Sequence, residues 1–255
     1  MTVRLDVFLA PSELTPAALE HRVVAVIDVL RATTTIAAAL HAGARTVIPF
    51  LTTEDAMRTA NRYQRGEVKL AGERQMVAIP GFELGNSPLE FTTASVGGQT
   101  VLLTTTNGTR ALLAAEDARA VYIASYGNFS LVRAQLLQAL QDGHSVSIVC
   151  AASEGMPSLE DSACAGRFVH SLVDAHAGLM MNDAARMCAL LSERYGDDLA
   201  ALCADAEHGR RLSDAGFAAD VMACATLDLY PVLGELVERA IVRVSTPRAA
   251  SSTSA

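Results

Sequence analysis

The segment that most restricts the possible folds is residues 23–29, which read Val-Val-Ala-Val-Ile-Asp-Val with a single polar side chain. A short, continuous apolar run of this kind is typical of a strand that is covered on both faces. Such strands belong to sheets whose crossover connections place helices on both sides. The segment therefore predicts an α/β protein.

The rest of the chain supports this class, because strand-like and helix-like segments alternate along it. Strands are expected at 3–8, 23–29, 46–50, 68–71, 100–104, 120–124, 145–150 and 241–244. Helices are expected at 33–41, 54–65, 108–115, 129–141, 159–177, 183–194, 199–208 and 218–227. No linker divides the chain, so we expect one compact domain over residues 1–245. Residues 246–255 are rich in serine and alanine and are expected to be a disordered tail.

Composition excludes several classes of function. The net charge is −8, tryptophan is absent and aromatic residues make up 5% of the chain, which argues against a nucleic-acid-binding protein. No apolar stretch is long enough to span a membrane, and no secretory signal is present. Five cysteines without a C-x-x-C pair indicate free thiols in the cytoplasm. Lys69 is the only lysine, so arginines must bind any anion.

Polar residues at the ends of the apolar strands are the candidate site residues, because ligands bind there in α/β sheets. Asp28 closes the first buried run and Arg31 follows at the start of a helix rich in threonine. The carboxylate is suited to hold a metal or to attack phosphorus, and the arginine to bind a phosphate or a carboxylate. An Asp–Arg ion pair beside threonine N-caps is the structural alternative.

A second polar turn follows the strand at 100–104. It contains Thr106, Asn107, Gly108, Thr109 and Arg110, which suit the binding of an oxyanion, with Gly108 allowing close approach of a ligand. The alternative is an ordinary N-capped helix after a turn.

A long irregular segment, 72–88, is the third candidate, since such segments inside compact domains are often functional. Its chemical groups are Glu73, Arg74, Asn86 and Ser87. A surface loop with ordinary glycine turns is the alternative.

Two acids at the start of the helix expected at 159–177 form the last candidate. Glu160 and Asp161 suit a divalent cation that prefers oxygen ligands, although acids in a first helical turn are also favoured by the helix dipole.

Cys150 stands at a strand end, but the residue six positions later is Met156, so the C-x5-R phosphate loop of cysteine phosphatases is absent. The six histidines lack metal-ligand spacing, which disfavours zinc.

Taken together, these motifs resemble the 2-phosphosulfolactate phosphatase family. The matching segments are 27–34, 70–74, 81–88, 105–110, 158–161 and a C-terminal pattern from His208 to Asp228. Where this family commonly has Cys-Ala-Gly, the chain has Cys150-Ala151-Ala152. The resemblance implies a three-layer α/β/α fold with a mixed, largely parallel sheet, a homodimer, and a Mg²⁺-dependent phosphatase that converts 2-phospho-3-sulfolactate to 3-sulfolactate on the route to coenzyme M.

On this basis we assign expected roles to the candidates. Asp28, Arg31, Glu73 and Arg74 are the expected catalytic residues, and Asp28, Glu160 and Asp161 the expected ligands of Mg²⁺. Substrate binding is assigned to Asn86, Ser87, Thr106, Asn107, Gly108, Thr109 and Arg110. Two alternatives remain open: a phosphatase for another 2-phosphohydroxy acid such as phospholactate, and a non-catalytic sensor of an anionic metabolite.

Overall fold

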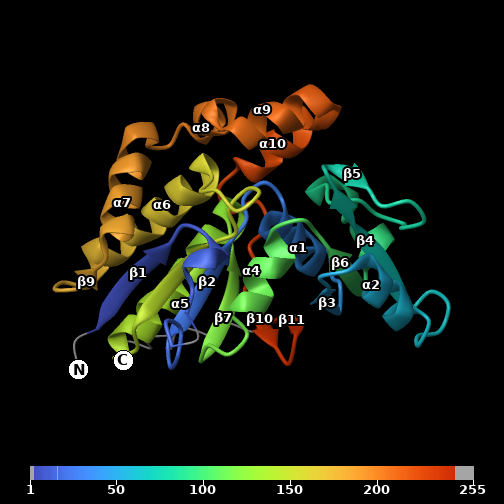
Figure 1. The fold of residues 1–255 in the computed structure, drawn as a ribbon, viewed down its shortest axis with the longest axis horizontal. Coiled ribbons are helices and arrows are strands. Elements are labelled where there is room, and N and C mark those ends of the chain that lie inside the picture. The colour runs from blue at the N-terminus through green and yellow to red at the C-terminus, as the bar shows by residue number, and fades with distance from the viewer. Residues whose placement is uncertain (1–2, 16, 245–255) are drawn as a thin grey trace, which may run out of the picture.

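The protein is built on one mixed sheet, which Figure 1 shows between layers of helices; the computed structural model describes residues 3–15 and 17–244. The strands are β1 (Arg4–Phe8), β2 (Val23–Ile27), β3 (Thr46–Pro49), β4 (Val68–Arg74), β5 (Val77–Ala78), β6 (Thr100–Thr104), β7 (Ala120–Ala124), β8 (Val146–Cys150), β9 (Met180–Met181), β10 (Gly234–Val237) and β11 (Ala240–Arg243). Residues 246–255, predicted to be a disordered tail, lie outside the described residues.

Helices connect most of these strands. The α-helices are α1 (Ala32–His41), α2 (Thr53–Ala60), α3 (Thr93–Val96), α4 (Gly108–Ala114), α5 (Phe129–Gln141), α6 (Leu159–Ala175), α7 (Asp183–Tyr195), α8 (Leu199–Asp205), α9 (Glu207–Leu212) and α10 (Ala218–Cys224). Shorter 3₁₀ turns are η1 (Pro11–Glu13), η2 (Pro88–Glu90) and η3 (Tyr126–Asn128), and the π-helical turn η4 (Ser213–Phe217) links α9 to α10.

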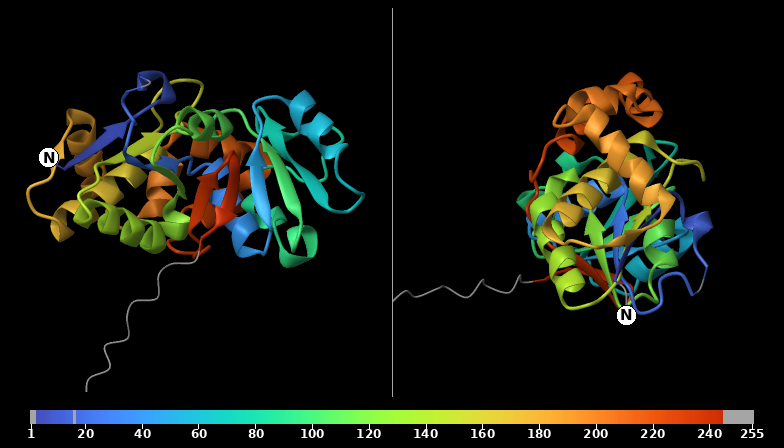
Figure 2. Two further views of the ribbon diagram at one scale, coloured as in Figure 1. Left: turned by 90° about the horizontal axis from the view of Figure 1, so that it is seen from below. Right: turned by 90° about the vertical axis from the view of Figure 1, so that its left-hand side faces the viewer.

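The sheet consists of two parallel blocks joined by a hairpin. Its strand order is β5-β4-β6-β3-β11-β10-β7-β2-β8-β1-β9. Strands β4, β6 and β3 are parallel to one another, as are β7, β2, β8, β1 and β9. The hairpin β10–β11 pairs antiparallel to β7 on one side and to β3 on the other. Figure 2 shows it, in red, between the two blocks. The prediction of a mixed, largely parallel sheet is confirmed.

Two apolar cores lie on opposite faces of this sheet, and β2 contributes to both. Val23, Ala25 and Ile27 pack with α5, α6 and α7, whereas Val24 and Val26 pack with α1 and α4. All five side chains are buried, as the apolar run predicted. The three-layer α/β/α class is therefore confirmed.

Helix α1 contacts strands of both parallel blocks and of the hairpin between them. It begins directly after β2 and packs across β7, β10 and β3. It therefore covers the junction between the two parallel blocks. Its first turn brings the end of β2 close to the start of α4, which follows β6 in the other block. This packing places strand ends from both blocks at one site.

Several predicted elements differ from the observed ones. The helix expected at 54–65 ends at Ala60, and the helix expected at 199–208 is divided into α8 and α9. The irregular segment 72–88 contains the end of β4 and the short strand β5. Strand β10 was not predicted, because Gly-Glu-Leu-Val lacks a local strand pattern and becomes a strand only by pairing with β11 and β7.

Candidate active site

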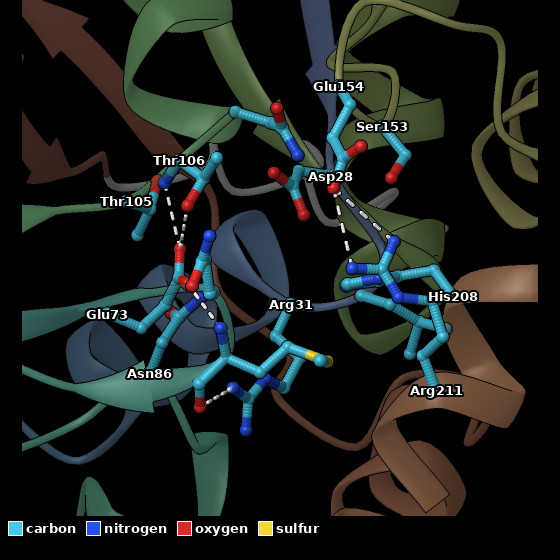
Figure 3. A pocket seen from close by; sticks show the side chains of 14 residues that line it. Asp28, Arg31, Glu73, Asn86, Thr105, Thr106, Ser153, Glu154, His208 and Arg211 are labelled. Carbon is cyan, nitrogen blue, oxygen red and sulfur yellow. Dashed lines mark hydrogen bonds and ion pairs between the residues drawn. The ribbon is translucent and has the colours of Figure 1, made fainter. Parts of the chain in front are cut away.

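A pocket lies where the ends of β2, β4 and β6 meet the segment after β8 and helix α9 (Figure 3). Its cavity has a volume of about 60 Å³. The lining residues are Asp28, Leu30, Arg31, Glu73, Gln75, Met76, Asn86, Thr105, Thr106, Asn107, Ser153, Glu154, His208 and Arg211. Of the residues proposed from sequence, the structure brings Asp28, Arg31, Glu73, Asn86, Thr106 and Asn107 together here.

Asp28 is fixed at the end of β2 by the first turn of α1. The backbone N–H of Ala32 donates to Asp28 Oδ1 at 2.9 Å, and the backbone N–H of Asp28 donates to Thr33 Oγ1 at 2.9 Å. Gly108 packs against the other oxygen, since a Cβ at this position would lie 2.7 Å from Asp28 Oδ2 and would also collide with Ala32. Gly108 is therefore required by this close approach of α4 to the carboxylate.

Three buried carboxyl groups interact electrostatically around the end of β2. Burial, followed by the negative charge of Asp161, raises the pKa of Asp28 to about 8. Burial and the charge of Glu160 raise the pKa of Asp161 to about 8, and burial and the charge of Asp28 raise that of Glu160 to about 7. At neutral pH the three carboxyl groups are therefore not all ionised. Either some of them carry a proton, or a bound cation balances their negative charge.

Glu73, near the end of β4, uses both carboxylate oxygens within the protein. Its Oε1 accepts from the backbone N–H of Thr106 at 2.8 Å and from Thr106 Oγ1 at 2.9 Å. Its Oε2 accepts from the backbone N–H of Met76 at 2.9 Å. Figure 3 shows Glu73 and Thr106 facing each other on one side of the pocket. Glu73 thus connects the turn after β6 to the β4–β5 hairpin.

Arg31 lines the pocket but is paired with a buried acid. Its Nη1 donates to Asp220 Oδ2 at 2.5 Å, and its guanidinium lies 4.4 Å from the centre of the Phe217 ring. Asp220 Oδ1 also accepts from Ser87 Oγ at 2.7 Å. Helix α10 therefore fixes Arg31. Sequence reasoning did not include Asp220 among the site residues, because its partner lies far away in the chain.

Other predicted site residues lie outside the pocket lining. Arg74 donates to the carbonyl oxygens of Glu73 and Leu51 and to Thr104 Oγ1. The Thr109 N–H donates to Thr105 Oγ1, and Arg110 is exposed. Ser87 is bonded to Asp220, as described above. Asp161 is buried, and its Oδ1 accepts from the backbone N–H of Val29 at 2.8 Å.

One side of the pocket was missed by sequence reasoning. It is formed by Ser153 and Glu154, which follow β8, and by His208 and Arg211 on α9. The Arg211 guanidinium lies 3.4 Å from Glu154 Oε1, and Figure 3 shows the two groups facing each other. Burial, followed by the charge of Arg211, lowers the pKa of His208. The motif His208-Gly209-Arg210-Arg211 was the available signal, but nothing local linked it to the strand ends.

The same four residues also line a second cavity that adjoins the first. It has a volume of about 400 Å³, and Glu160, Glu207 and Ser158 contribute to its walls. Glu160 therefore faces the adjoining cavity, whereas Asp28 faces the first one.

Among residues 3–15 and 17–244, no group of three or more His, Cys, Asp or Glu side chains is arranged to enclose a metal ion. This does not conflict with a Mg²⁺ site, because Mg²⁺ commonly binds one or two protein carboxylates and completes its shell with water and substrate phosphate. Asp28 and Asp161 are oxygen donors whose mutual repulsion a cation would relieve. The donor chemistry of the site fits Mg²⁺.

The five cysteines are free and buried. Burial raises the pKa of Cys150 well above its usual value, so its thiol stays protonated and is a poor nucleophile. A search of the described helices finds none that is both long and apolar enough to cross a membrane.

The fold and the pocket define a class. Buried carboxyls, amides, hydroxyls and arginines at the strand ends of a three-layer α/β protein are typical of an enzyme that acts on a small polar ligand. Comparison with known proteins gives the family: the chain belongs to the 2-phosphosulfolactate phosphatase family, whose model matches residues 8–239. The family resemblance of the sequence motifs is therefore confirmed.

Curated relatives cover nearly the whole chain. A protein of Symbiobacterium thermophilum is 42% identical over 224 residues, which are 88% of this chain and 95% of the relative. Proteins of Synechococcus sp. and Clostridium beijerinckii are 38% and 31% identical, covering 95% and 91% of this chain and 100% and 96% of the relatives. Each of the three is described as a probable 2-phosphosulfolactate phosphatase.

Proposed function

We propose that the protein hydrolyses the phosphate ester of 2-phospho-3-sulfolactate and releases 3-sulfolactate and inorganic phosphate, on a route to coenzyme M. One observation carries this proposal: Asp28 is held at the end of β2, against Gly108, in a pocket that also contains Arg31 and Arg211. The family and the descriptions of the relatives support the same substrate.

The reaction places defined demands on this site. A water oxygen forms a bond to phosphorus and gives up a proton, the bond between phosphorus and the substrate C2 oxygen breaks, and that oxygen takes up a proton. A carboxyl group with a pKa of about 7 carries a proton near neutral pH, and Glu160 meets this condition. The backbone N–H and the side-chain amide of Asn107, which lines the pocket, are suited to donate to the phosphate oxygens, whereas both donors of Thr106 are bonded to Glu73.

Mg²⁺ is part of the proposal, with Asp28 and Asp161 as the residues that would hold it. Glu160, also expected as a ligand from the sequence, faces the adjoining cavity and is assigned the proton instead. When bound, the cation neutralises charge on the phosphate oxygens, which is a main source of catalysis in phosphoryl transfer. Arg31 adds a fixed positive charge whose position is set by Asp220.

Asp28 has two possible roles, as the nucleophile that forms a phosphoenzyme or as the group that orients water. Rapid acid quench, digestion at low pH and mass spectrometry of the peptides distinguish them. A phosphoenzyme adds the mass of one phosphoryl group to the peptide that contains Asp28, whereas direct attack by water leaves the peptide unmodified.

The function is tested by measuring phosphate release from 2-phosphosulfolactate and from 2-phospholactate, with Mg²⁺ and with EDTA. We expect release that requires Mg²⁺ and is faster with 2-phosphosulfolactate. A faster reaction with 2-phospholactate would assign another 2-phosphohydroxy acid as the substrate. No release from either ester, together with thermal stabilisation by sulfolactate, would contradict the proposal and indicate a sensor.

We also expect a homodimer in the cytoplasm. Buried free thiols agree with a reducing compartment. Sedimentation analysis at micromolar concentration tests the dimer, and a monomer would contradict it.

A further inference from the structure

The substrate proposed above carries two acidic groups besides its phosphate, a carboxylate on C1 and a sulfonate on C3. The first cavity, at about 60 Å³, is smaller than the 300–1,000 Å³ typical of small-molecule sites. The adjoining cavity, at about 400 Å³, shares Ser153, Glu154, His208 and Arg211 with it. A substrate with its phosphate beside Asp28 must therefore extend towards these shared residues.

Two arginines line the first cavity, and they differ in availability. The Arg31 side chain is 2% exposed and bonded at 2.5 Å to Asp220, which is itself buried. The Arg211 side chain is 40% exposed, and its ion pair with the 71% exposed Glu154 is long, at 3.4 Å. Exposed ion pairs of this kind contribute little to stability, so exchange of Glu154 for another anion costs little.

Arg211 also lies where a substrate anion could replace Glu154 as its partner. It lines both cavities, whereas Arg31 lines only the first one. Glu154, Glu160 and Glu207 give the adjoining cavity acidic walls, and Arg211 is the arginine among its lining residues. An anionic group that enters this cavity therefore requires Arg211. Guanidinium binds such oxyanions through paired N–H donors and stays charged at all physiological pH values.

We propose that Arg211 binds the sulfonate of the substrate in place of Glu154 and thereby makes the enzyme prefer 2-phosphosulfolactate to 2-phospholactate. This inference rests on the proposed function. The sulfonate is the bulkier of the two acids, so it takes the side with more room. Glu154 occupies the guanidinium when substrate is absent and competes with the sulfonate for it.

The test compares Arg211→Gln with the wild type on both esters, in the presence of Mg²⁺. We expect KM for 2-phosphosulfolactate to rise about 10- to 100-fold, as for loss of a charged hydrogen-bonded partner. The kinetic constants for 2-phospholactate, which has a methyl group at C3, should change less than about threefold. Glu154→Gln should lower KM for 2-phosphosulfolactate, because it removes the competing anion.

Arg210→Gln is the matched control, because Arg210 is on the same helix, is exposed and donates to the Asp205 carbonyl oxygen, outside both cavities. Thermal melting checks that each variant is folded. An equal loss on both esters in Arg211→Gln would overturn the inference, because Arg211 would then serve the carboxylate or the phosphate. Unchanged constants on both esters would also overturn it.

The test separates this inference from the proposed function. If the wild type releases no phosphate from either ester, the proposed function fails, but this result does not decide whether Arg211 binds a sulfonate. Calorimetric titration with 3-sulfolactate and with lactate then tests Arg211 directly. The inference holds if Arg211→Gln weakens the binding of 3-sulfolactate alone, and it fails if the two proteins bind 3-sulfolactate equally.

Discussion

The two sides of the pocket differ in how firmly their charged groups are held. The inner wall, Asp28, Glu73 and Thr105, is 4–7% exposed, and its carboxylates accept hydrogen bonds of 2.8–2.9 Å from backbone N–H groups. In the outer wall, Glu154 and Arg211 have side chains that are 71% and 40% exposed and lie 3.4 Å apart. A reacting group must be positioned before substrate arrives, whereas a group that recognises substrate must be free to change partners.

The largest expected effect comes from the inner wall. Asp28→Asn keeps the shape of the side chain but removes its charge, so we expect kcat to fall by about 10³-fold or more. Steady-state phosphate release measures this, with circular dichroism to confirm folding. Asp174→Asn, an exposed acid on α6, is the control and should keep full activity. A folded Asp28→Asn variant with near-wild-type turnover would remove Asp28 from the mechanism.

Gly108→Ala tests how closely the inner wall is packed. The new methyl group would meet Asp28 Oδ2 at 2.7 Å, so the carboxylate must move. We expect a loss of about 10²-fold in kcat and of about 1–3 kcal/mol in the free energy of unfolding. In the control Gly85→Ala, the nearest atoms are at the flexible end of Glu90, 3.2 Å away. Equal activities of the two variants would show that this contact does not position Asp28.

Asp220→Asn tests whether Arg31 belongs with the firmly held groups. The substitution leaves the buried guanidinium without its charged partner, and breaking such a pair costs about 3–5 kcal/mol. Denaturant unfolding measures this loss, and we expect kcat to fall about tenfold as Arg31 loses its fixed position. Removal of both charges in Arg31→Met/Asp220→Leu should restore stability but not activity. A stable, fully active Asp220→Asn would show that the pair positions nothing.

The effect expected to change activity least is on the pH dependence of stability. The pKa of Asp161 is about 8 in the folded protein, against an ordinary value of 3.8. Between these values the folded protein keeps a proton that the unfolded chain releases, so its stability falls as pH rises from about 4 to 8.

Thermal melting in EDTA at pH 5 and pH 8 measures this fall. We expect a smaller fall in Asp161→Asn, which keeps an oxygen for the Val29 N–H but cannot titrate. Mg²⁺ should also raise the melting temperature of the wild type more at pH 8 than at pH 5. Identical pH dependence in the two proteins would show that Asp161 carries no raised pKa.

The inner wall could be predicted largely from sequence, whereas the outer wall could not. Asp28 and Glu73 of the inner wall, and the neighbouring Thr106 and Asn107, closely follow strand-like segments, so their place at strand ends follows from local pattern. Thr105, the third residue of the inner wall, lies in the same turn but was not among the predicted site residues. Ser153 and Glu154 also follow a strand, but no pattern connects them with Arg211 on α9. That contact depends on how α8, α9 and α10 fold back over the strand ends, which Figure 1 shows.

The sequence by itself determined the class of the fold, because continuous apolar runs such as 23–27 are stable only between two layers of helices. Local periodicity likewise set most helices and strands. Tertiary structure decided that β10–β11 joins two parallel blocks, that Asp220 fixes Arg31, and that Glu154 meets Arg211. The physical reason is that periodicity records which side of a segment is buried, whereas the partner of each side chain depends on long-range packing.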